Sequence, residues 1–149
     1  MANLCFQAKA YWNFLFKSKT KYRIHSPFVY GLVTQCLERP SGFKKLSAQD
    51  QLLRLKNYHL KHTSPKSQVM HGHTFENLDD FNVISNYIEN SSEESFFLIH
   101  SPHASQNKEK LWERLTSNPL LNVSIDLFSV GILYKRPHQV KEHFSIRLL

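Results

Sequence analysis

Four histidines stand close to two segments that we expect to form neighbouring strands. His71 and His73 follow the first segment, and His100 and His103 follow the second. Because these strands should be adjacent and parallel, the four side chains should lie near the same edge of the sheet. Imidazole is the commonest metal ligand and suits Zn²⁺ or a similar ion. The four histidines are therefore a candidate metal site.

The same histidines also have a plainer interpretation as ordinary loop residues. Glu76, Asp79 and Asp80 are close in sequence and would pair with the imidazoles when these are protonated. The sequence contains no HExxH pattern and no cysteine close enough to complete the set. Both interpretations stay open at this point.

Nucleophilic catalysis has little support in the sequence. The two cysteines, Cys5 and Cys36, fall in segments that we expect to be helical. We expect both to be reduced thiols that pack as small apolar side chains, while a single disulfide between them remains an alternative. The GxSxG and Walker patterns are absent.

Charge is distributed unevenly along the 149 residues, whose formal net charge is +7. Residues 1–66 carry twelve Lys and Arg against two Asp and Glu, which gives +10, whereas residues 67–149 carry seven against ten, which gives −3. A basic half of this kind can bind nucleic acid, an anionic membrane surface or an acidic partner, or can simply be a solvated face.

We expect a cytoplasmic protein with no transmembrane segment. No apolar run approaches the length of about 20 residues that spans a bilayer. The N-terminus has no basic residue before Lys9, and Gln7 and Asn13 interrupt its apolar run, so it is unlike a signal peptide.

The first 62 residues show only helical patterns. Apolar spacing predicts helices over residues 3–18, 27–37 and 48–62. Ser26 and Pro27 suit the start of the second helix, and a Pro and Gly cluster at residues 39–42 ends it. The first helix, with its aromatic residues and lysines, could cap a core, lie on a membrane surface or stack on single-stranded nucleic acid.

After a turn cluster at residues 63–67 the pattern changes to alternating strands and helices. The predicted strands cover residues 67–71, 96–99, 122–127 and 131–135, and the predicted helices cover 77–89 and 107–117, with a last helical turn at 138–144. The short connection between the last two strands favours an antiparallel hairpin. We therefore expect an N-terminal helical segment, residues 1–62, and an α/β segment, residues 63–149, packed as one compact unit.

Both parts of the chain carry motifs of a known family. The stretch FQAKAYWNFLFKSKTKYRIHSPFVYGLVTQCL, and HSPFV within it above all, resembles the N-terminal helical extension of a bacterial family of class I S-adenosylmethionine-dependent methyltransferase-like proteins. Residues 96–149 resemble the last third of that family, with a hairpin of the type VxIDxFxxGxxxxR and a closing HFxIR. The matching positions are Val123, Ile125, Asp126, Phe128, Gly131, Arg136, His143, Phe144, Ile146 and Arg147.

The resemblance covers roughly residues 6–62 and 67–149 and leaves out the middle of the family. Members contain three further strands and a glycine-rich turn that holds the cofactor, and no ELGxxxG-like stretch occurs in this chain. Of the family's strand order 3-2-1-4-5-7-6, only 4-5-7-6 would remain. The expected fold is thus a partial Rossmann-like methyltransferase sheet of about four strands, with no binding of S-adenosylmethionine.

Acidic groups of the family are also replaced. Where members show a DGNH-like motif after strand four, this chain has His71, Gly72, His73 and Thr74. After strand five, an acidic pair followed by His is replaced so that only His103 remains. The resemblance therefore implies a truncated, degenerate relative that is not a working methyltransferase.

Loss of the first three strands would turn the normally central strand four into an edge. An open edge invites pairing with another chain, so we expect a non-catalytic module that self-associates or binds a protein partner there. One alternative is an RNA- or phosphate-binding accessory protein that uses the basic N-terminal half. Others are a methyltransferase completed by another subunit, an enzyme that uses the histidines with a metal, and a decayed product without function.

Overall fold

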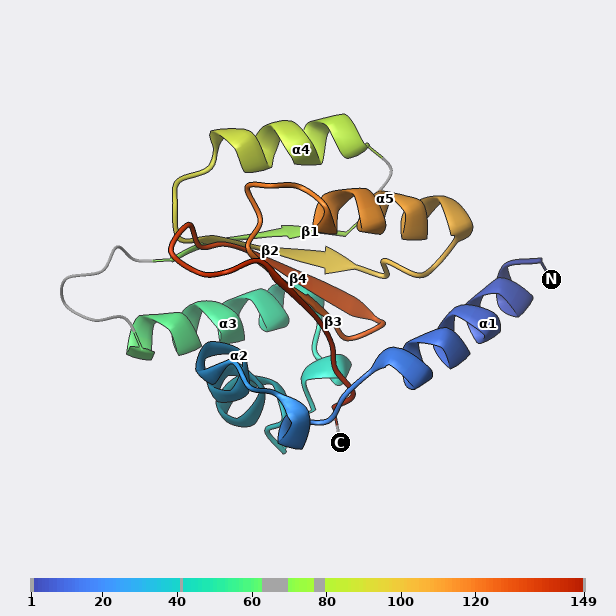
Figure 1. Ribbon diagram of the computed structural model, residues 1–149, viewed down its shortest axis with the longest axis horizontal. Helices are drawn as coiled ribbons and strands as arrows, with labels where there is room; N and C mark the ends of the chain where they lie inside the picture. Colours follow the sequence, from blue (N-terminus) through green and yellow to red (C-terminus); the bar gives the residue numbers. More distant parts are fainter. Residues whose placement is uncertain (1, 41, 63–69, 77–79, 149) are drawn as a thin grey trace.

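The computed structural model describes residues 2–40, 42–62, 70–76 and 80–148, and arranges them in three layers around a mixed sheet (Figure 1). The helices in chain order are α1 (Ala2–Lys17), η1 (Lys21–Arg23), α2 (Pro27–Leu32), η2 (Val33–Leu37), η3 (Phe43–Lys45), α3 (Ala48–His62), α4 (Phe81–Asn90) and α5 (Gln106–Thr116). The strands are β1 (His71–Phe75), β2 (Ser95–His100), β3 (Val123–Asp126), β4 (Val130–Lys135) and β5 (Glu142–Ser145).

The sheet has the order β1-β2-β4-β3-β5. β1 runs parallel to β2, and β5 runs parallel to β3, while β4 is antiparallel to both of its neighbours. The expected antiparallel hairpin is therefore confirmed as β3 and β4. The four strands β1, β2, β4 and β3 also lie in the order expected from the sequence.

The N-terminal helices form where their periodicity predicts them. α1 and α3 match the expected ranges to within a residue. The predicted helix over residues 27–37 is realised as α2 followed by a π-helical turn, η2. Ser26 caps α2 by accepting a hydrogen bond from Val29 N–H, and Pro27 occupies the first turn, where its missing N–H costs nothing.

Apolar side chains fill both spaces between the sheet and its helices. On one face, α2, η2 and α3 cover one set of alternating sheet residues. The hydrophobic cluster between these helices and the sheet includes Leu32, Leu37, Phe43, Leu55, Phe96, Leu98 and Tyr134. On the other face, α4 and α5 cover Phe97, Ile99 and Leu133 with Ile84, Ile88, Trp112 and Leu115. Strand β2 is thus buried on both sides, as its continuous apolar run predicts.

Three sequence predictions need correction. The strand predicted at residues 67–71 begins only at His71 and runs to Phe75, while residues 67–69 lie outside the described residues. The helix predicted over 77–89 is described from Phe81 to Asn90, and residues 77–79 are likewise outside. The last helical turn predicted at 138–144 is wrong, because Glu142–Ser145 forms a fifth strand, β5.

The reason for β5 lies in the hydrogen-bonding needs of β3. The backbone N–H of Glu142 donates to Asn122 O at 2.8 Å, and that of Ile146 donates to Asp126 O at 2.9 Å. These bonds satisfy the side of β3 that β4 does not reach, and a lone helical turn would leave it open. Local sequence does not contain this long-range requirement.

Two glycines allow close packing of rings on the sheet. A Cβ atom at Gly72 would overlap the ring of Phe96, and one at Gly131 would overlap the indole of Trp112. Gly131 belongs to the VxIDxFxxG pattern, so part of that motif serves the packing of α5 against β4.

The described residues include no helix that combines the length and the apolar character required to cross a membrane. Both cysteines are free thiols, Cys5 exposed and Cys36 buried.

Candidate functional site

The structure does not bring the four predicted metal ligands together. His71 and His73 lie within β1 instead of following it, and the register pairs His71 with Ser95, at the start of β2. His100 ends β2, five residues further along, which is roughly 16 Å at the rise of a strand. The expectation that all four side chains share one edge is therefore wrong.

The separated histidines have different local environments. His73 Nδ1 lies 3.1 Å from the hydroxyl of Tyr87 on α4, and burial lowers the pKa of His73. Burial also lowers the pKa of His100, against an opposing effect of Glu76. Within the described ranges, no group of three or more His, Cys, Asp or Glu side chains is placed to hold a metal ion.

His103, in the loop after β2, forms a buried pair with Asp126 at the end of β3. His103 Nε2 lies 2.7 Å from Asp126 Oδ2, and the other carboxylate oxygen accepts a hydrogen bond from Phe128 N–H at 2.8 Å. The ring of Phe128 stacks on the imidazole, with centroids 5.2 Å apart. Burial lowers the pKa of His103, but the hydrogen bond and charge of Asp126 outweigh it, so the net shift is upward.

A cavity of about 300 Å³ lies beside this pair, between α1, α5 and β3. His103 and Asp126 have the geometry of a general base and its orienting carboxylate. However, the second imidazole nitrogen, Nδ1, is buried 3.8 Å from a carboxylate oxygen of Glu109. A histidine held between two carboxylates suits a cation better than a proton acceptor, so we interpret the pair as an ionic link between the β2–α5 loop and β3.

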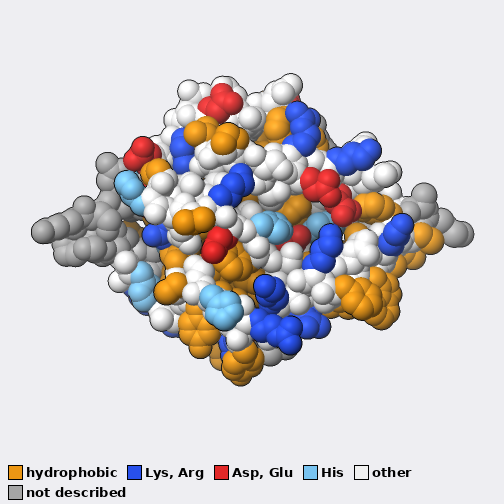
Figure 2. All heavy atoms as spheres, viewed as in Figure 1, with side chains coloured by type: hydrophobic (Ala, Val, Ile, Leu, Met, Phe, Trp, Pro, Cys, Tyr) orange, Lys and Arg blue, Asp and Glu red, His pale blue; other side chains and the backbone are white. Residues whose placement is uncertain are grey.

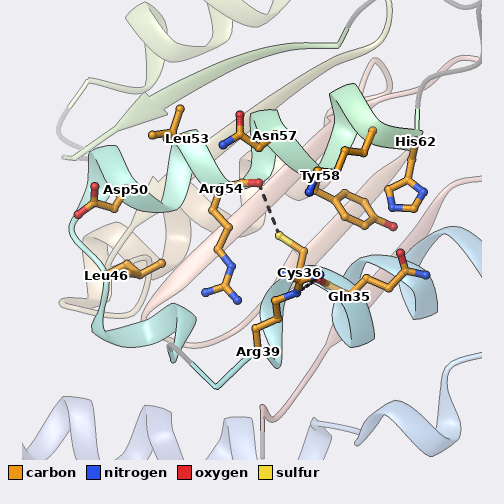
Figure 3. A pocket seen from close by; sticks show the side chains of 11 residues that line it. Gln35, Cys36, Arg39, Leu46, Asp50, Leu53, Arg54, Asn57, Tyr58 and His62 are labelled. Carbon is orange, nitrogen blue, oxygen red and sulfur yellow. Dashed lines mark hydrogen bonds between the residues drawn. The ribbon is translucent and has the colours of Figure 1, made fainter.

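A second cavity, of about 410 Å³, lies between η2 and α3 (Figure 3). Its walls are held by local structure that the sequence encodes. Gly42 adopts a left-handed conformation, with φ of 65°, that lets the chain reverse after η2. Ser47 Oγ then accepts a hydrogen bond from Asp50 N–H at 3.2 Å and donates one to the Asp50 carboxylate at 2.7 Å, which caps α3.

Two guanidinium groups reach this cavity from different elements. Arg54 extends from α3, and Arg39 lies across the cavity, after the end of η2 (Figure 3). Arg39 Nε donates to Gln35 O at 2.8 Å, which fixes its side chain against η2. Cys36 lies between the two walls, with its Sγ 3.9 Å from Arg54 O.

The pKa of Cys36 shows whether its thiol could act as a nucleophile in this cavity. Burial raises the pKa of the Cys36 thiol to about 11, and the charges of Arg54 and Arg39 act in the opposite direction. A thiol with this pKa is protonated at neutral pH and is a poor nucleophile. The cavity is therefore suited to binding, and its cysteine is not suited to attack.

The lining of this basic pocket has an excess of positive charge. Arg39, Arg54 and Lys61 contribute three cations, and Asp50 contributes the one carboxylate, so the described lining carries +2 at neutral pH. Tyr58 and His62 close one end, with ring centroids 4.4 Å apart. Planar guanidinium groups in a partly enclosed space are suited to phosphate or carboxylate oxygens.

Sequence reasoning did not single out this pocket. The +10 charge of residues 1–66 indicates an anion-binding half, but it does not say which cations converge. Arg39 and Arg54 are separated by the turn at Gly42 and the start of α3, and only the packing of α3 on η2 brings them to one cavity.

The outer side of β1 is the remaining candidate surface. His71 N–H donates to Glu94 O at 3.3 Å, toward β2, so the N–H groups of Gly72 and Thr74 point to the opposite side. Among the residues that the structure describes, β1 has a strand partner on one side only. The expected edge position of this strand is confirmed.

Compared with known proteins, the chain matches no family model, no curated protein and no solved structure.

Proposed function

We propose that this protein is a non-catalytic binding module whose basic pocket, between η2 and α3, takes a small phosphorylated ligand. The observation that carries the proposal is the convergence of Arg39 and Arg54, from two separate elements, on one partly enclosed cavity. The proposal favours the phosphate-binding alternative that the charge of the N-terminal half suggests.

Size and charge both suit such a ligand. Pockets for small molecules usually measure about 300–1,000 Å³, and this cavity measures about 410 Å³. A phosphate monoester carries a charge of about −1.5 to −2 at pH 7, which is opposite in sign to the net charge of the lining residues. Arg39 is already held by Gln35 O, so less side-chain freedom is lost when a ligand binds.

Calorimetric titration with inorganic phosphate and with adenosine monophosphate tests the proposal. We expect saturable binding that weakens about tenfold or more in Arg39→Gln, because one charge-assisted hydrogen bond contributes about 1.5–3 kcal/mol. Arg54→Gln should act similarly. Arg23→Gln is the matched control, since Arg23 is exposed in η1 and its loss changes the net charge by the same amount.

Equal weakening by Arg23→Gln would contradict the proposal, because it would indicate binding to the overall positive charge. Binding of an RNA oligonucleotide without binding of either small ligand would also contradict the proposal. It would indicate that RNA binds to an extended basic surface and that the pocket is not the binding site.

The relation to the methyltransferase-like family is part of the proposal. The order β1-β2-β4-β3, with β4 antiparallel, corresponds to strands 4-5-7-6 of that fold and supports a partial Rossmann-like sheet. The sequence lacks the family's glycine-rich cofactor turn. Titration with S-adenosylmethionine should give no saturable heat, and stoichiometric binding would instead support an enzyme completed by another subunit.

Self-association through β1 is a second candidate function, favoured by the one-sided pairing of that strand. Two copies that pair these edges would satisfy the outward N–H groups of Gly72 and Thr74. Sedimentation velocity at micromolar concentration should then show a dimer, and amide exchange at Thr74 should slow as concentration rises. A monomer with concentration-independent exchange would exclude this role.

A further inference from the structure

α1 extends away from the sheet and leaves most of its surface in solvent (Figure 1). Of its described side chains, only Ala10 and Phe14 are buried. Leu4, Trp12 and Phe16 remain 74%, 62% and 83% exposed. A helix that only capped the core would bury its large apolar residues, so these three side chains require another explanation.

The exposed apolar side chains belong to a segment without acidic residues. Residues 1–37 contain no Asp or Glu, and the basic residues among them are Lys9, Lys17, Lys19, Lys21 and Arg23. Lys21 is paired with Glu38 at 2.9 Å, while Lys9, Lys17 and Lys19 are exposed. Figure 2 shows hydrophobic side chains grouped over α1, with Lys and Arg side chains beside them.

The C-terminal end of the chain adds a further cation to this region. Lys19 N–H donates to Ser145 O at 2.7 Å, and Arg147 N–H donates to Lys19 O at 3.0 Å. Both Lys19 and Arg147 have exposed side chains. The backbone link therefore places another positive charge next to the end of α1.

From this combination we propose that α1 binds the surface of an anionic lipid bilayer. Leu4, Trp12 and Phe16 would enter the boundary between headgroups and acyl chains, and the surrounding lysines would contact the headgroups. The 16-residue helix is roughly 24 Å long and would lie in the plane of the interface. A protein groove or a second copy would bury the same apolar residues, but the excess of lysines over carboxylates within this segment favours an anionic surface over an uncharged one.

The two tryptophans make the proposal directly measurable. Trp12 is exposed on α1, whereas Trp112 is 3% exposed between α5 and the sheet. Transfer of Trp12 into lipid should shift the fluorescence emission to shorter wavelength, while the signal of Trp112 stays constant. We expect this shift with vesicles of phosphatidylcholine plus phosphatidylserine, much less with phosphatidylcholine alone, and a weakening as salt increases.

Variants separate the apolar and the electrostatic contributions. Phe16→Ser should weaken vesicle binding by roughly tenfold or more, because it removes a large apolar side chain from the interface. Lys9→Gln should weaken it by about fivefold. Val140→Ser is the matched control, since Val140 is 79% exposed outside α1. The exposed positions should leave the fold unchanged, which circular dichroism checks.

Several results would overturn the proposal. Equal binding to neutral and anionic vesicles would remove its electrostatic basis, and full binding by Phe16→Ser would remove its apolar basis. A shift of the fluorescence to shorter wavelength as protein concentration rises, in the absence of vesicles, would indicate that α1 binds a second copy of the protein. Arg54→Gln distinguishes this surface from the basic pocket, because it should weaken phosphate binding about tenfold or more and leave vesicle binding unchanged.

Discussion

Replacing His59 by Gln should change how the stability of this protein depends on pH. His59 lies on α3 and is 5% exposed. Its Nε2 lies 3.0 Å from the hydroxyl of Tyr134 on the central strand β4, and the ring of Phe28 stacks beside it. Burial, followed by the charges of Arg136 and His62, lowers the pKa of His59 to about 4. The side chain is therefore neutral in the folded protein under most conditions.

The magnitude follows from the difference between the folded and unfolded pKa values. In the unfolded chain His59 should titrate near 6.5, so between pH 6.5 and 4 only the unfolded chain takes up the proton. The contribution is fully present above pH 6.5 and is lost as pH falls through about 4. With about 1.4 kcal/mol for each pKa unit, the loss is about 2 kcal/mol at pH 5 and about 3 kcal/mol at pH 4.

Urea unfolding of the wild type and of His59→Gln at a series of pH values isolates this effect. Gln can keep a hydrogen bond to Tyr134 but does not titrate, and other titrating groups are common to both proteins. The stability advantage of the wild type should shrink by about 3 kcal/mol between pH 7.5 and 4. His138→Gln, at an exposed position, is the control for the substitution of a histidine by Gln. A constant difference between wild type and His59→Gln would refute a buried, neutral His59.

Three further predictions concern other buried groups. Asp126→Asn should lower the free energy of unfolding by about 2 kcal/mol at pH 6 and by less at pH 9. The pKa of His103 is raised in the folded protein, so its ion pair with Asp126 stabilises the fold at low pH and this stabilisation is lost as pH rises. Chemical denaturation at both pH values checks this. Cys5 should react rapidly with a thiol reagent at pH 8, whereas Cys36 should react only after unfolding, since it is buried with a pKa of about 11. Gly131→Ala should cost about 1–3 kcal/mol in urea unfolding, because the added methyl group overlaps the indole packed on β4.

Much of this fold could be predicted from local sequence because its elements are strongly patterned. The apolar run at Phe96–Ile99 forms the doubly covered strand β2, and the capping residue Ser26 starts α2 where it was expected. Elements that depend on distant partners were predicted less well. β5 exists because β3 needs a second neighbour, and β1 begins later than predicted because its pairing with β2 sets its position.

The candidate sites show the same division between local and long-range information. The histidine hypothesis assumed that His71 and His73 follow their strand, and a shift of that strand along the chain separates them from His100. The basic pocket depends on the docking of α3 against η2, which brings together Arg39 and Arg54. Net charge predicts that cations are abundant in this half but contains no information about which of them meet.

The described helices α2, η2 and α3 cover a face of the sheet, where His59 bonds to Tyr134. The outer N–H groups of β1, the basic pocket and the apolar surface of α1 are made by different residues. An edge-paired dimer would therefore present two pockets and two copies of α1. Once one α1 helix is bound to the membrane, the second is held close to the same surface at a high effective concentration, so the dimer should attach more strongly than the monomer. If the protein both dimerises through β1 and binds membranes through α1, dilution below the dissociation constant of the dimer should weaken vesicle binding. The phosphate affinity of each pocket should stay unchanged.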